Sequence, residues 1–420
     1  MQYIVTNNSK LNGEVDICGA KNSVLGLIAA SILCEDIIEL ENVPMVTDVF
    51  NLIESIKSIG SNVTIDKKNH KLIIDNKNID PTKKINDQYV RKLRASYYLL
   101  VALLGRFKTT TVALPGGCQI GSRPIDIHIK AFEHLGGIVC IQNGNIQINA
   151  TKLIGKKIYL DFPSVGATIN LILAAVLAEG ETVILNAAKE PHIVDIAEFL
   201  STMGANIKGA GTDKITVKGV KKLHSTTYCT MPDQIEAGTF LAVGAISGGN
   251  ITIKNVIPNH LNCITYKLME MGCDIKYYDD KVNIKRTSIL KASDITTLPY
   301  PGFPTDMQPQ MSAVLGVAKG TSIIKETIFE NRFMYANELN RMGAKMTVHD
   351  KINVIEGINH YQGTSVVVPD LRAGAALTIA ALVADGTTTI DNIDLIERGY
   401  ENFDLKLNSL GANIKKINNN

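Results

Sequence analysis

One short motif recurs six times along this chain of 420 residues, and it constrains the fold more than any other feature. Each copy consists of an apolar residue, a glycine, a small residue, a variable residue and a second apolar residue. The copies are IGSNV at 59–63, LGGIV at 135–139, MGANI at 203–207, MGCDI at 271–275, MGAKM at 342–346 and LGANI at 410–414. Successive motif glycines lie 68 to 76 residues apart, so the pattern predicts six structural repeats of about 70 residues.

Every repeat predicts the same order of elements, and the third repeat shows it clearly. Its Ala-rich segment at 166–180 is typical of an apolar helix that ends at a glycine suited to a left-handed cap, and a β-branched strand follows directly. After a loop, HIVDIAEFLSTMG has apolar residues at helical spacing, and residues 214–220 form a closing strand. Because the Ala-rich helices are apolar on nearly all sides, we expect sheets to enclose them.

The length of the chain favours two domains of roughly 200 residues rather than one core. Three repeats in each domain would give two similar α/β domains with sheets outside and apolar helices inside. The first strand, residues 2–7, precedes the first Ala-rich helix, and we expect it to pair with the last repeat. The chain would then cross between domains twice, which predicts one domain at 22–230 and a second formed by 1–21 and 231–420.

Composition narrows the classes of function. The 43 basic and 41 acidic side chains nearly cancel and form no long basic run, which argues against a nucleic-acid partner. Seven scattered cysteines without a Cys-x-x-Cys pair argue against a disulfide framework or a zinc site and favour the cytoplasm. The apolar stretch at 23–34 is too short to span a bilayer and is expected to be a core helix. We expect a monomer without a membrane or metal partner.

Three repeats place a cation at the start of an Ala-rich helix. Lys21, followed by Asn22, lies in GAKNS, Arg94 lies in KLRAS, and Arg372 lies in DLRAG. A cation at a helix N-terminus costs stability unless negative charge lies opposite. Solvation at the surface explains each cation singly, whereas three at one structural position favour a shared anion site.

Two further residues depart from the repeat. Asp306 in FPTDM stands at the head of the fifth Ala-rich helix, where it is either an N-cap or a general base facing the cations. Arg398 in ERGYE precedes the final helix, where the alternative to an anion contact is a local ion pair.

The loop of the second repeat, LPGGCQIGSRPIDIH at 114–128, is longer and richer in glycine and proline than its counterparts. Its Cys118 lies near Arg123 and other cations, which favours an ionised, reactive thiol. His128 alone is more often structural than catalytic. The residues therefore predict an enzyme that holds polyanionic substrates in a cleft between two domains and moves protons with a thiol and a carboxylate.

Eight motifs together resemble one family. In order along nearly the whole chain they are GAKNS, LRAS, LPGGCQIGSRPIDIH, SVGAT, FPTDMQ, ENRFM, DLRA and ERGYE, and they resemble the UDP-N-acetylglucosamine enolpyruvyl transferases. The resemblance implies a pair of inside-out α/β barrels, the enolpyruvyl transferase fold, and no cofactor. It also implies transfer of the enolpyruvyl group of phosphoenolpyruvate to the 3-hydroxyl of UDP-N-acetylglucosamine with release of phosphate, the first committed step of peptidoglycan synthesis.

The resemblance assigns catalytic roles residue by residue. Cys118 matches the general acid that protonates the methylene carbon of phosphoenolpyruvate and can form an adduct with it. Asp306 matches the candidate base for the sugar hydroxyl. Lys21, Arg123 and Arg398 match residues that hold phosphate and carboxylate groups.

The resemblance also implies a set of sugar-nucleotide contacts. The matching residues are Asn22, Arg94, Arg123, Pro124, Ile125, Asp126, Ile127, Asp306 and Ile328, and Arg372 is a further expected substrate contact. Ser164, Val165 and Gly166 of SVGAT are expected to meet the diphosphate through hydroxyl and N–H groups at a helix start. Some members have a basic residue two places before that serine, whereas this chain has Phe162, so one charge contact is missing or supplied elsewhere.

Two rival families are consistent with parts of this pattern. The shikimate-phosphate enolpyruvyl transferases share the fold and the donor but usually lack the cysteine loop, so GAKNS and PGGC argue against them. An RNA terminal phosphate cyclase or a catalytically silent relative would share parts of the repeat. The near-neutral charge argues against RNA, and Cys118 with Asp306 and Arg398 argues against a silent relative.

Overall fold

The computed structural model describes residues 1–7, 10–83, 85, 87–90, 96–113 and 126–418. The chain forms two compact units, which are described separately. The terminal unit comprises Met1–Cys18 and Pro232–Asn420, and the inserted unit comprises the described residues from Gly19 to Met231. The chain thus passes between units at 18/19 and at 231/232, where the sequence predicts crossings near 21 and 230.

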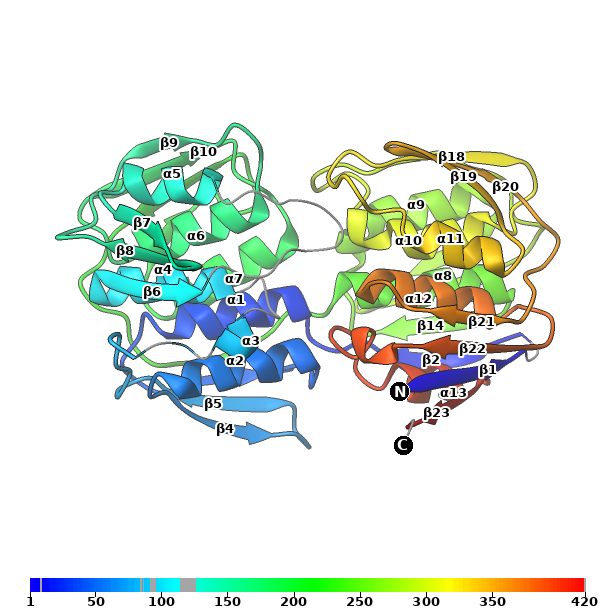
Figure 1. The fold of residues 1–420 in the computed structure, drawn as a ribbon, viewed down its shortest axis with the longest axis horizontal. Helices are drawn as coiled ribbons and strands as arrows, with labels where there is room; N and C mark the ends of the chain where they lie inside the picture. The colour runs from blue at the N-terminus through cyan, green and yellow to red at the C-terminus, as the bar shows by residue number, and fades with distance from the viewer. Residues whose placement is uncertain (8–9, 84, 86, 91–95, 114–125, 419–420) are drawn as a thin grey trace. The chain divides into compact units, whose positions relative to one another are not determined.

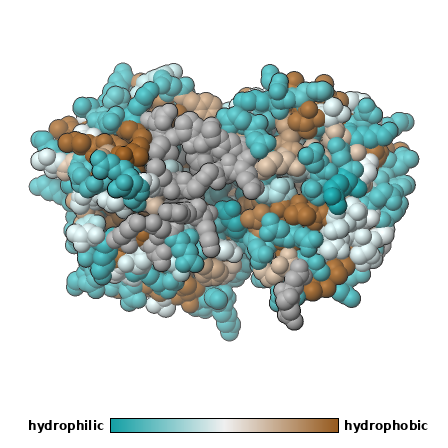
Figure 2. Space-filling view, viewed as in Figure 1, coloured by the Kyte–Doolittle hydropathy of each residue, from teal (hydrophilic) through white to brown (hydrophobic). Residues whose placement is uncertain are grey.

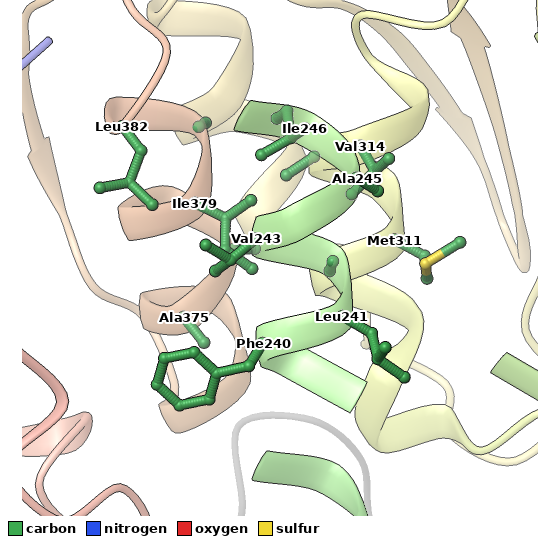
Figure 3. Packing of buried hydrophobic residues seen from close by; sticks show 14 of the residues in the cluster. Phe240, Leu241, Val243, Ala245, Ile246, Met311, Val314, Ala375, Ile379 and Leu382 are labelled. Atoms are coloured by element: carbon green, nitrogen blue, oxygen red, sulfur yellow. The ribbon is translucent and has the colours of Figure 1, made fainter. Parts of the chain in front are cut away.

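Six apolar helices form the interior of the two units (Figure 1). They are α1 (Lys21–Ser31), α4 (Ser96–Phe107), α6 (Val165–Ala175), α8 (Gln234–Ser247), α10 (Gln308–Leu315) and α12 (Leu371–Ala381). In the inserted unit, α4 packs against α1 and α6. In the terminal unit, α8 packs against α10 and α12, and Figure 3 shows Phe240 and Val243 of α8 beside Ala375 and Ile379 of α12. These side chains are at most 1% exposed, as expected for helices that are apolar on all sides.

The third inner helix is shorter than the sequence predicts. It ends at Ala175; the Val176 N–H still donates to Ile172 O, and the Ala178 N–H makes a tighter bond to Ala175 O at 3.1 Å. The glycine at the end of the Ala-rich segment, Gly180, has a φ of 86°, as the left-handed cap requires. The final turn therefore tightens before the glycine reverses the chain.

Six amphipathic helices follow the same order along the chain. They are α2 (Thr47–Ser58), α5 (Asp126–His134), α7 (Pro191–Thr202), α9 (Asn262–Glu270), α11 (Tyr335–Arg341) and α13 (Phe403–Ser409). Each helix ends two residues before a motif glycine, and all six motif glycines have φ between 87° and 110°. A side chain is strained at such an angle, which explains why the repeated motif contains glycine.

The strands form six sheets within the described residues, and each unit has its sheets outside its inner helices (Figure 1). The terminal unit holds the sheets β21-β22-β1-β23, β15-β16-β14-β2 and β17-β18-β20-β19, and the inserted unit holds β11-β12-β10-β9, β13-β3-β5-β4 and β6-β8-β7. The strand bounds are β1 Gln2–Thr6, β2 Asn12–Asp16, β3 Ile38–Glu41, β4 Asn62–Asp66, β5 Lys71–Asp75, β6 Thr109–Ala113, β7 Ile138–Gln142, β8 Asn145–Asn149, β9 Lys157–Tyr159, β10 Glu181–Leu185, β11 Asn206–Lys208, β12 Lys214–Lys218, β13 Thr226–Cys229, β14 Asn250–Lys254, β15 Cys273–Tyr277, β16 Lys281–Arg286, β17 Ile295–Thr296, β18 Thr321–Lys325, β19 Lys345–His349, β20 Ile352–Glu356, β21 Ser365–Val367, β22 Thr387–Asp391 and β23 Asn413–Ile417.

Strand pairing explains how the chain joins the two units. In three repeats, the strand before the inner helix pairs in parallel with the strand after that helix, as in β9–β10, β17–β18 and β21–β22. The first and fourth repeats exchange these strands, because β2 before α1 pairs with β14, and β13 before α8 pairs with β3. The expected pairing of the first strand with the last repeat is confirmed, since Ile4 lies opposite Thr389 of β22 and Lys415 of β23.

A repeated asparagine follows the strand that comes after the inner helix. Four repeats have it, as Asn42, Asn186, Asn255 and Asn392, each with φ between 54° and 66°. Each side-chain amide donates to the backbone oxygen of the residue that follows the neighbouring parallel strand. These acceptors are Thr230, Leu160, Ile17 and Val368, at 2.6 to 3.1 Å. In the fifth repeat, Glu326 takes the asparagine's place after β18.

The visible surface is largely hydrophilic, with separate hydrophobic patches (Figure 2). In the part of the chain that the structure describes, none of the helices has the length and apolar character needed to span a bilayer.

Candidate active site

Several residues singled out from the sequence cannot be placed. Arg94, Cys118, Arg123, Pro124 and Ile125 lie outside the described residues. The next two, Asp126 and Ile127, are the first residues of α5, and the Ile127 side chain packs against the core of the inserted unit.

The start of α1 holds a largely buried cation. Lys21 is the first residue of this helix and is 9% exposed, whereas Asn22 beside it is more accessible. The Lys21 Nζ atom lies 3.3 Å from Oδ2 of Asp48, a 2%-exposed carboxylate in the first turn of α2. The chain itself therefore supplies negative charge opposite this cation. The sequence gives no separate signal for Asp48, because an acid in a first helical turn is expected for the helix dipole alone.

A buried carboxylate fixes the same helix start. Asp195 of α7 accepts hydrogen bonds from the Ser23 hydroxyl and, at 2.7 Å, from the Tyr228 hydroxyl. Ser23 lies in the first turn of α1, and Tyr228 lies on β13. Asp195 thus joins three elements of the inserted unit and orients the turn that presents Lys21 and Asn22.

Replacing Asp195 with asparagine is expected to change how stability depends on pH. Burial raises the pKa of Asp195 above its ordinary value of 3.8, against the opposing effect of its hydrogen bonds to Ser23 and Tyr228. The folded state therefore holds this proton more tightly than the unfolded chain. The contribution of this group to stability is largest below pH 3.8 and is lost as the pH rises through the raised pKa.

The measurement is Tm as a function of pH, from about pH 4 to about pH 8, for wild type and variant. The Tm of Asp195→Asn relative to wild type should rise with pH. The control is Asp213→Asn, which alters an exposed carboxylate of the same unit and should follow the wild-type curve. Parallel curves for Asp195→Asn and wild type would contradict the prediction.

The start of α6 presents backbone donors beside an aromatic contact. Ser164 is the N-cap, and its Oγ accepts from Ala167 N–H at 3.3 Å, while Val165 and Gly166 are the first helical residues. N–H groups in a first helical turn have no partner inside the helix and favour anions. A Cβ on Gly166 would lie 2.8 Å from Cε1 of His128, so glycine is needed at this close approach.

His128 makes structural contacts, in line with the expectation for a single histidine. Its ring stacks on Tyr97 with centroids 5.8 Å apart, and its Nδ1 lies 2.7 Å from Nδ2 of Asn170. Phe162, at the position where some relatives have a basic residue, is 42% exposed. It supplies no charge to an anion there.

In the terminal unit, two arginines hold Asp306. Its Oδ1 accepts from Nη2 of Arg332 at 3.1 Å, and its Oδ2 accepts from Nε and Nη2 of Arg372 at 3.3 and 3.1 Å. Both guanidiniums are nearly buried, whereas the Asp306 side chain is 29% exposed. The N-cap alternative is wrong, because Asp306 lies in the short helix η2 (Thr305–Met307) and the N-cap of α10 is Met307. This carboxylate is held in a fixed orientation and is partly exposed.

Both the backbone and the guanidinium of Arg372 are fixed by neighbouring residues. Asp370, the N-cap of α12, accepts the backbone N–H of Arg372 at 2.8 Å and lies 3.8 Å from Nη1 of Arg332. The Arg372 guanidinium lies over the Tyr400 ring, 5.4 Å from its centroid. Burial by itself lowers the pKa of Arg372, but Tyr400 and Asp306 outweigh it and raise the pKa above its ordinary range. Arg372 is therefore a permanent cation. The other arginine, Arg332, lies in the ENRFM motif, which the sequence places in the family pattern without assigning Arg332 a role.

Two other predicted residues of this unit lie in loops. Ile328 follows β18, and its N–H donates to Oε1 of Glu326 at 2.8 Å. Arg398 lies after the short helix η3 (Ile393–Leu395) and is partly exposed.

Over the described residues, no group of three metal-ligating side chains forms a metal site.

The two units each provide a distinct kind of chemistry. The inserted unit offers a buried lysine and two helix starts, which suit anionic groups. The terminal unit offers a carboxylate between permanent cations, which suits proton transfer next to developing negative charge.

Comparison with known proteins places this chemistry in a family. The model of the family described as EPSP synthase (3-phosphoshikimate 1-carboxyvinyltransferase) matches residues 5–407. UDP-N-acetylglucosamine 1-carboxyvinyltransferase of Clostridium botulinum is 50% identical to this chain over 98% of it and 99% of the relative. UDP-N-acetylglucosamine 1-carboxyvinyltransferase 2 of Bacillus subtilis is 49% identical, over 98% of this chain and 95% of the relative.

Solved structures support the predicted fold. The enolpyruvyl transferase NikO from Streptomyces tendae superimposes with a TM-score of 0.88 at 24% identity, over 99% of this chain and 98% of its own. EPSP synthase from Acinetobacter baumannii gives a TM-score of 0.76 at 19% identity, over 99% of both chains. The predicted enolpyruvyl transferase fold is confirmed. By its sequence similarity over nearly the whole length, the chain is an enzyme that belongs to the UDP-N-acetylglucosamine 1-carboxyvinyltransferase family.

Proposed function

We propose that this enzyme transfers the enolpyruvyl group of phosphoenolpyruvate to the 3-hydroxyl of UDP-N-acetylglucosamine and releases phosphate. The main support is identity near 50% to transferases of this name over nearly the whole chain. The GAKNS and PGGC motifs, which argue against a shikimate-phosphate substrate, support the same acceptor. The reaction would serve peptidoglycan synthesis in the cytoplasm, with the two substrates as partners and neither nucleic acid nor membrane required.

Donor activation is proposed for residues of the GAKNS motif and the glycine-rich loop. Cys118 would protonate the methylene carbon of phosphoenolpyruvate. Lys21 and Arg123 would hold its phosphate and carboxylate, joined by Arg398. The burial of Lys21 supports this role, because a largely desolvated ammonium interacts strongly with an anion, and a substrate anion would share this ammonium with Asp48. Arg94 would add a further cation.

Acceptor activation is proposed for Asp306. Removing the proton from the 3-hydroxyl creates an oxyanion that attacks the central carbon of phosphoenolpyruvate as the methylene carbon is protonated, which gives a tetrahedral intermediate. Phosphate then leaves that carbon while the new methyl group loses a proton, and the enolpyruvyl double bond is restored. Asp306 is proposed to receive that proton because Arg332 and Arg372 fix its position and keep it ionised, and its side chain is partly exposed. Arg372 would also stabilise negative charge on the substrates.

The sugar nucleotide is proposed to be held by the residues that match the family's sugar-nucleotide contacts. Ser164, Val165 and Gly166 would meet its diphosphate at the start of α6. The other proposed contacts are Asn22, Arg94, Arg123, Pro124, Ile125, Asp126, Ile127, Asp306 and Ile328. Some family members have a basic residue where this chain has Phe162. The N–H groups at the start of α6 would therefore contribute a larger share of the diphosphate binding here than in those members.

The test is phosphate release with phosphoenolpyruvate as donor and either UDP-N-acetylglucosamine or shikimate 3-phosphate as acceptor. We expect turnover with the sugar nucleotide and a rate with shikimate 3-phosphate no higher than with no acceptor. Absence of release with UDP-N-acetylglucosamine would overturn the proposal, and turnover with shikimate 3-phosphate would favour the rival family.

A further inference from the structure

A buried carboxylate next to Asp306 has no place in the roles above. Glu326, directly after β18, is 1% exposed and accepts four hydrogen bonds. Its Oε1 accepts from the Thr297 hydroxyl at 3.0 Å and from the N–H groups of Ile328 and Phe329 at 2.8 and 3.1 Å. Its Oε2 accepts from the Thr305 hydroxyl at 3.0 Å. One side chain therefore joins three separate segments.

The other repeats show that this carboxylate is a departure from the scaffold. At the same position, four repeats use an asparagine whose amide donates to the backbone after the neighbouring parallel strand. In the fifth repeat that neighbouring residue is Thr297, and the polarity is reversed, because its hydroxyl donates to Glu326. Glu326 does not share the positive φ of the four asparagines, and the Thr297 backbone oxygen accepts from the Thr327 hydroxyl at 2.6 Å instead. The longer carboxylate adds contacts to Thr305 and to the Ile328–Phe329 turn.

Both added contacts lead to proposed substrate residues. Thr305 immediately precedes Asp306 in η2, so its hydroxyl fixes the backbone from which the Asp306 carboxylate projects. The turn that donates two N–H groups to Glu326 contains Ile328 itself. A link through a single rigid group sets the position of the base relative to the sugar contact. Misplacement of a reacting group by about 1 Å can cost about 100-fold in rate.

We propose that Glu326 is a positioning residue that holds Asp306 and Ile328 in register for the acceptor sugar, an inference that rests on the proposed function. It touches no substrate and acts through Thr305 and the backbone of the 328–329 turn. The fifth repeat has exchanged the scaffold amide for a carboxylate to make this link.

Three variants separate the parts of the link. Glu326→Ala removes all four acceptor contacts and should lower kcat/KM for UDP-N-acetylglucosamine by about 10- to 100-fold, with a higher KM and a lower kcat. Thr305→Val breaks only the contact on the Asp306 side, and should lower kcat by about tenfold while KM changes little. Glu326→Gln should stay within about threefold of wild type, because its amide oxygen can keep the Oε1 contacts and its NH₂ group can donate to the Thr305 hydroxyl.

The matched control is Asn255→Ala, which removes the equivalent side-chain link in the fourth repeat, from Asn255 Nδ2 to Ile17 O. It should lower Tm as Glu326→Ala does, yet leave kcat and KM unchanged. If Glu326→Ala lowers Tm without changing either kinetic constant, Glu326 is only structural and the proposal is overturned. The same holds if Glu326→Gln loses as much activity as Glu326→Ala. Failure of wild type to turn over UDP-N-acetylglucosamine would instead overturn the proposed function.

Discussion

Replacing Asp306 with asparagine is expected to lower kcat by about 10²- to 10⁴-fold, the range that one general base contributes. Asparagine keeps the shape of the side chain but only one acceptor oxygen, so one of Arg332 and Arg372 keeps its acceptor while the other faces an NH₂ donor. It cannot take up the proton of the sugar hydroxyl, and it removes the negative charge between two nearly buried guanidiniums. The measurement is phosphate release with both substrates saturating, together with Tm.

The control for this prediction is Glu54→Gln. It neutralises a half-exposed carboxylate of α2 that, among the residues the structure describes, forms an ion pair with Lys57 one turn away. The control should keep wild-type kcat. Activity of Asp306→Asn within tenfold of wild type would exclude the base role and leave Asp306 as a structural partner of the two arginines.

Replacing Cys118 with aspartate is expected to preserve measurable turnover while abolishing inactivation by an epoxide such as fosfomycin. A carboxylic acid can still donate a proton to the methylene carbon, but a carboxylate opens an epoxide far less readily than a thiolate. Wild type should lose all activity and gain the mass of one inhibitor on Cys118. The measurement is residual activity against time, with mapping of the modified peptide.

The other thiols help to make this labelling selective. Burial raises the pKa of Cys263 and of Cys273 to about 11. It also raises the pKa of Cys18, Cys34 and Cys229, so few of these thiols are ionised at neutral pH. Full inactivation of the Cys118→Asp enzyme by the epoxide would mean that the reactive group lies elsewhere.

The local pattern of the sequence predicts the repeats but not their exchange of strands. The motif glycines recur because each must adopt a positive φ after an amphipathic helix, which is a local demand written in the sequence. The partner with which a strand pairs is not set by such a local demand. The strands at 12–16 and 157–159 both precede an apolar helix, yet the first pairs with β14 and the second with the strand after its own helix. Which partner is available depends on the packing of whole units.

The sequence likewise identifies some residues of the candidate site and misses others. Lys21, Asp306 and Arg372 stand out in the sequence because a charged group at the head of an apolar helix breaks the repeat. Asp48 and Asp195 do not, since an acid in an amphipathic helix is ordinary until its neighbours in space are known. The same is true of Glu326, whose significance is visible only when the repeats are aligned by structure. Sequence therefore identifies residues that disturb a local pattern and misses those that hold them in place.

The pairing of β1 and β2 with strands from the end of the chain also has a consequence for assembly during synthesis. Strands β1 and β2 precede the inserted unit in the chain, but their partners β14, β22 and β23 begin only at residue 250 or later. The inserted unit, which runs from Gly19 to Met231, has all of its strand partners within itself and can be complete before them. Because domains generally fold as units while the chain emerges, the N-terminal strands must stay unpaired through the folding of a whole domain. Strands β1 and β2 are therefore synthesised before the inserted unit but reach their partners after it, and an unpaired strand edge of this kind is a site for pairing with other chains.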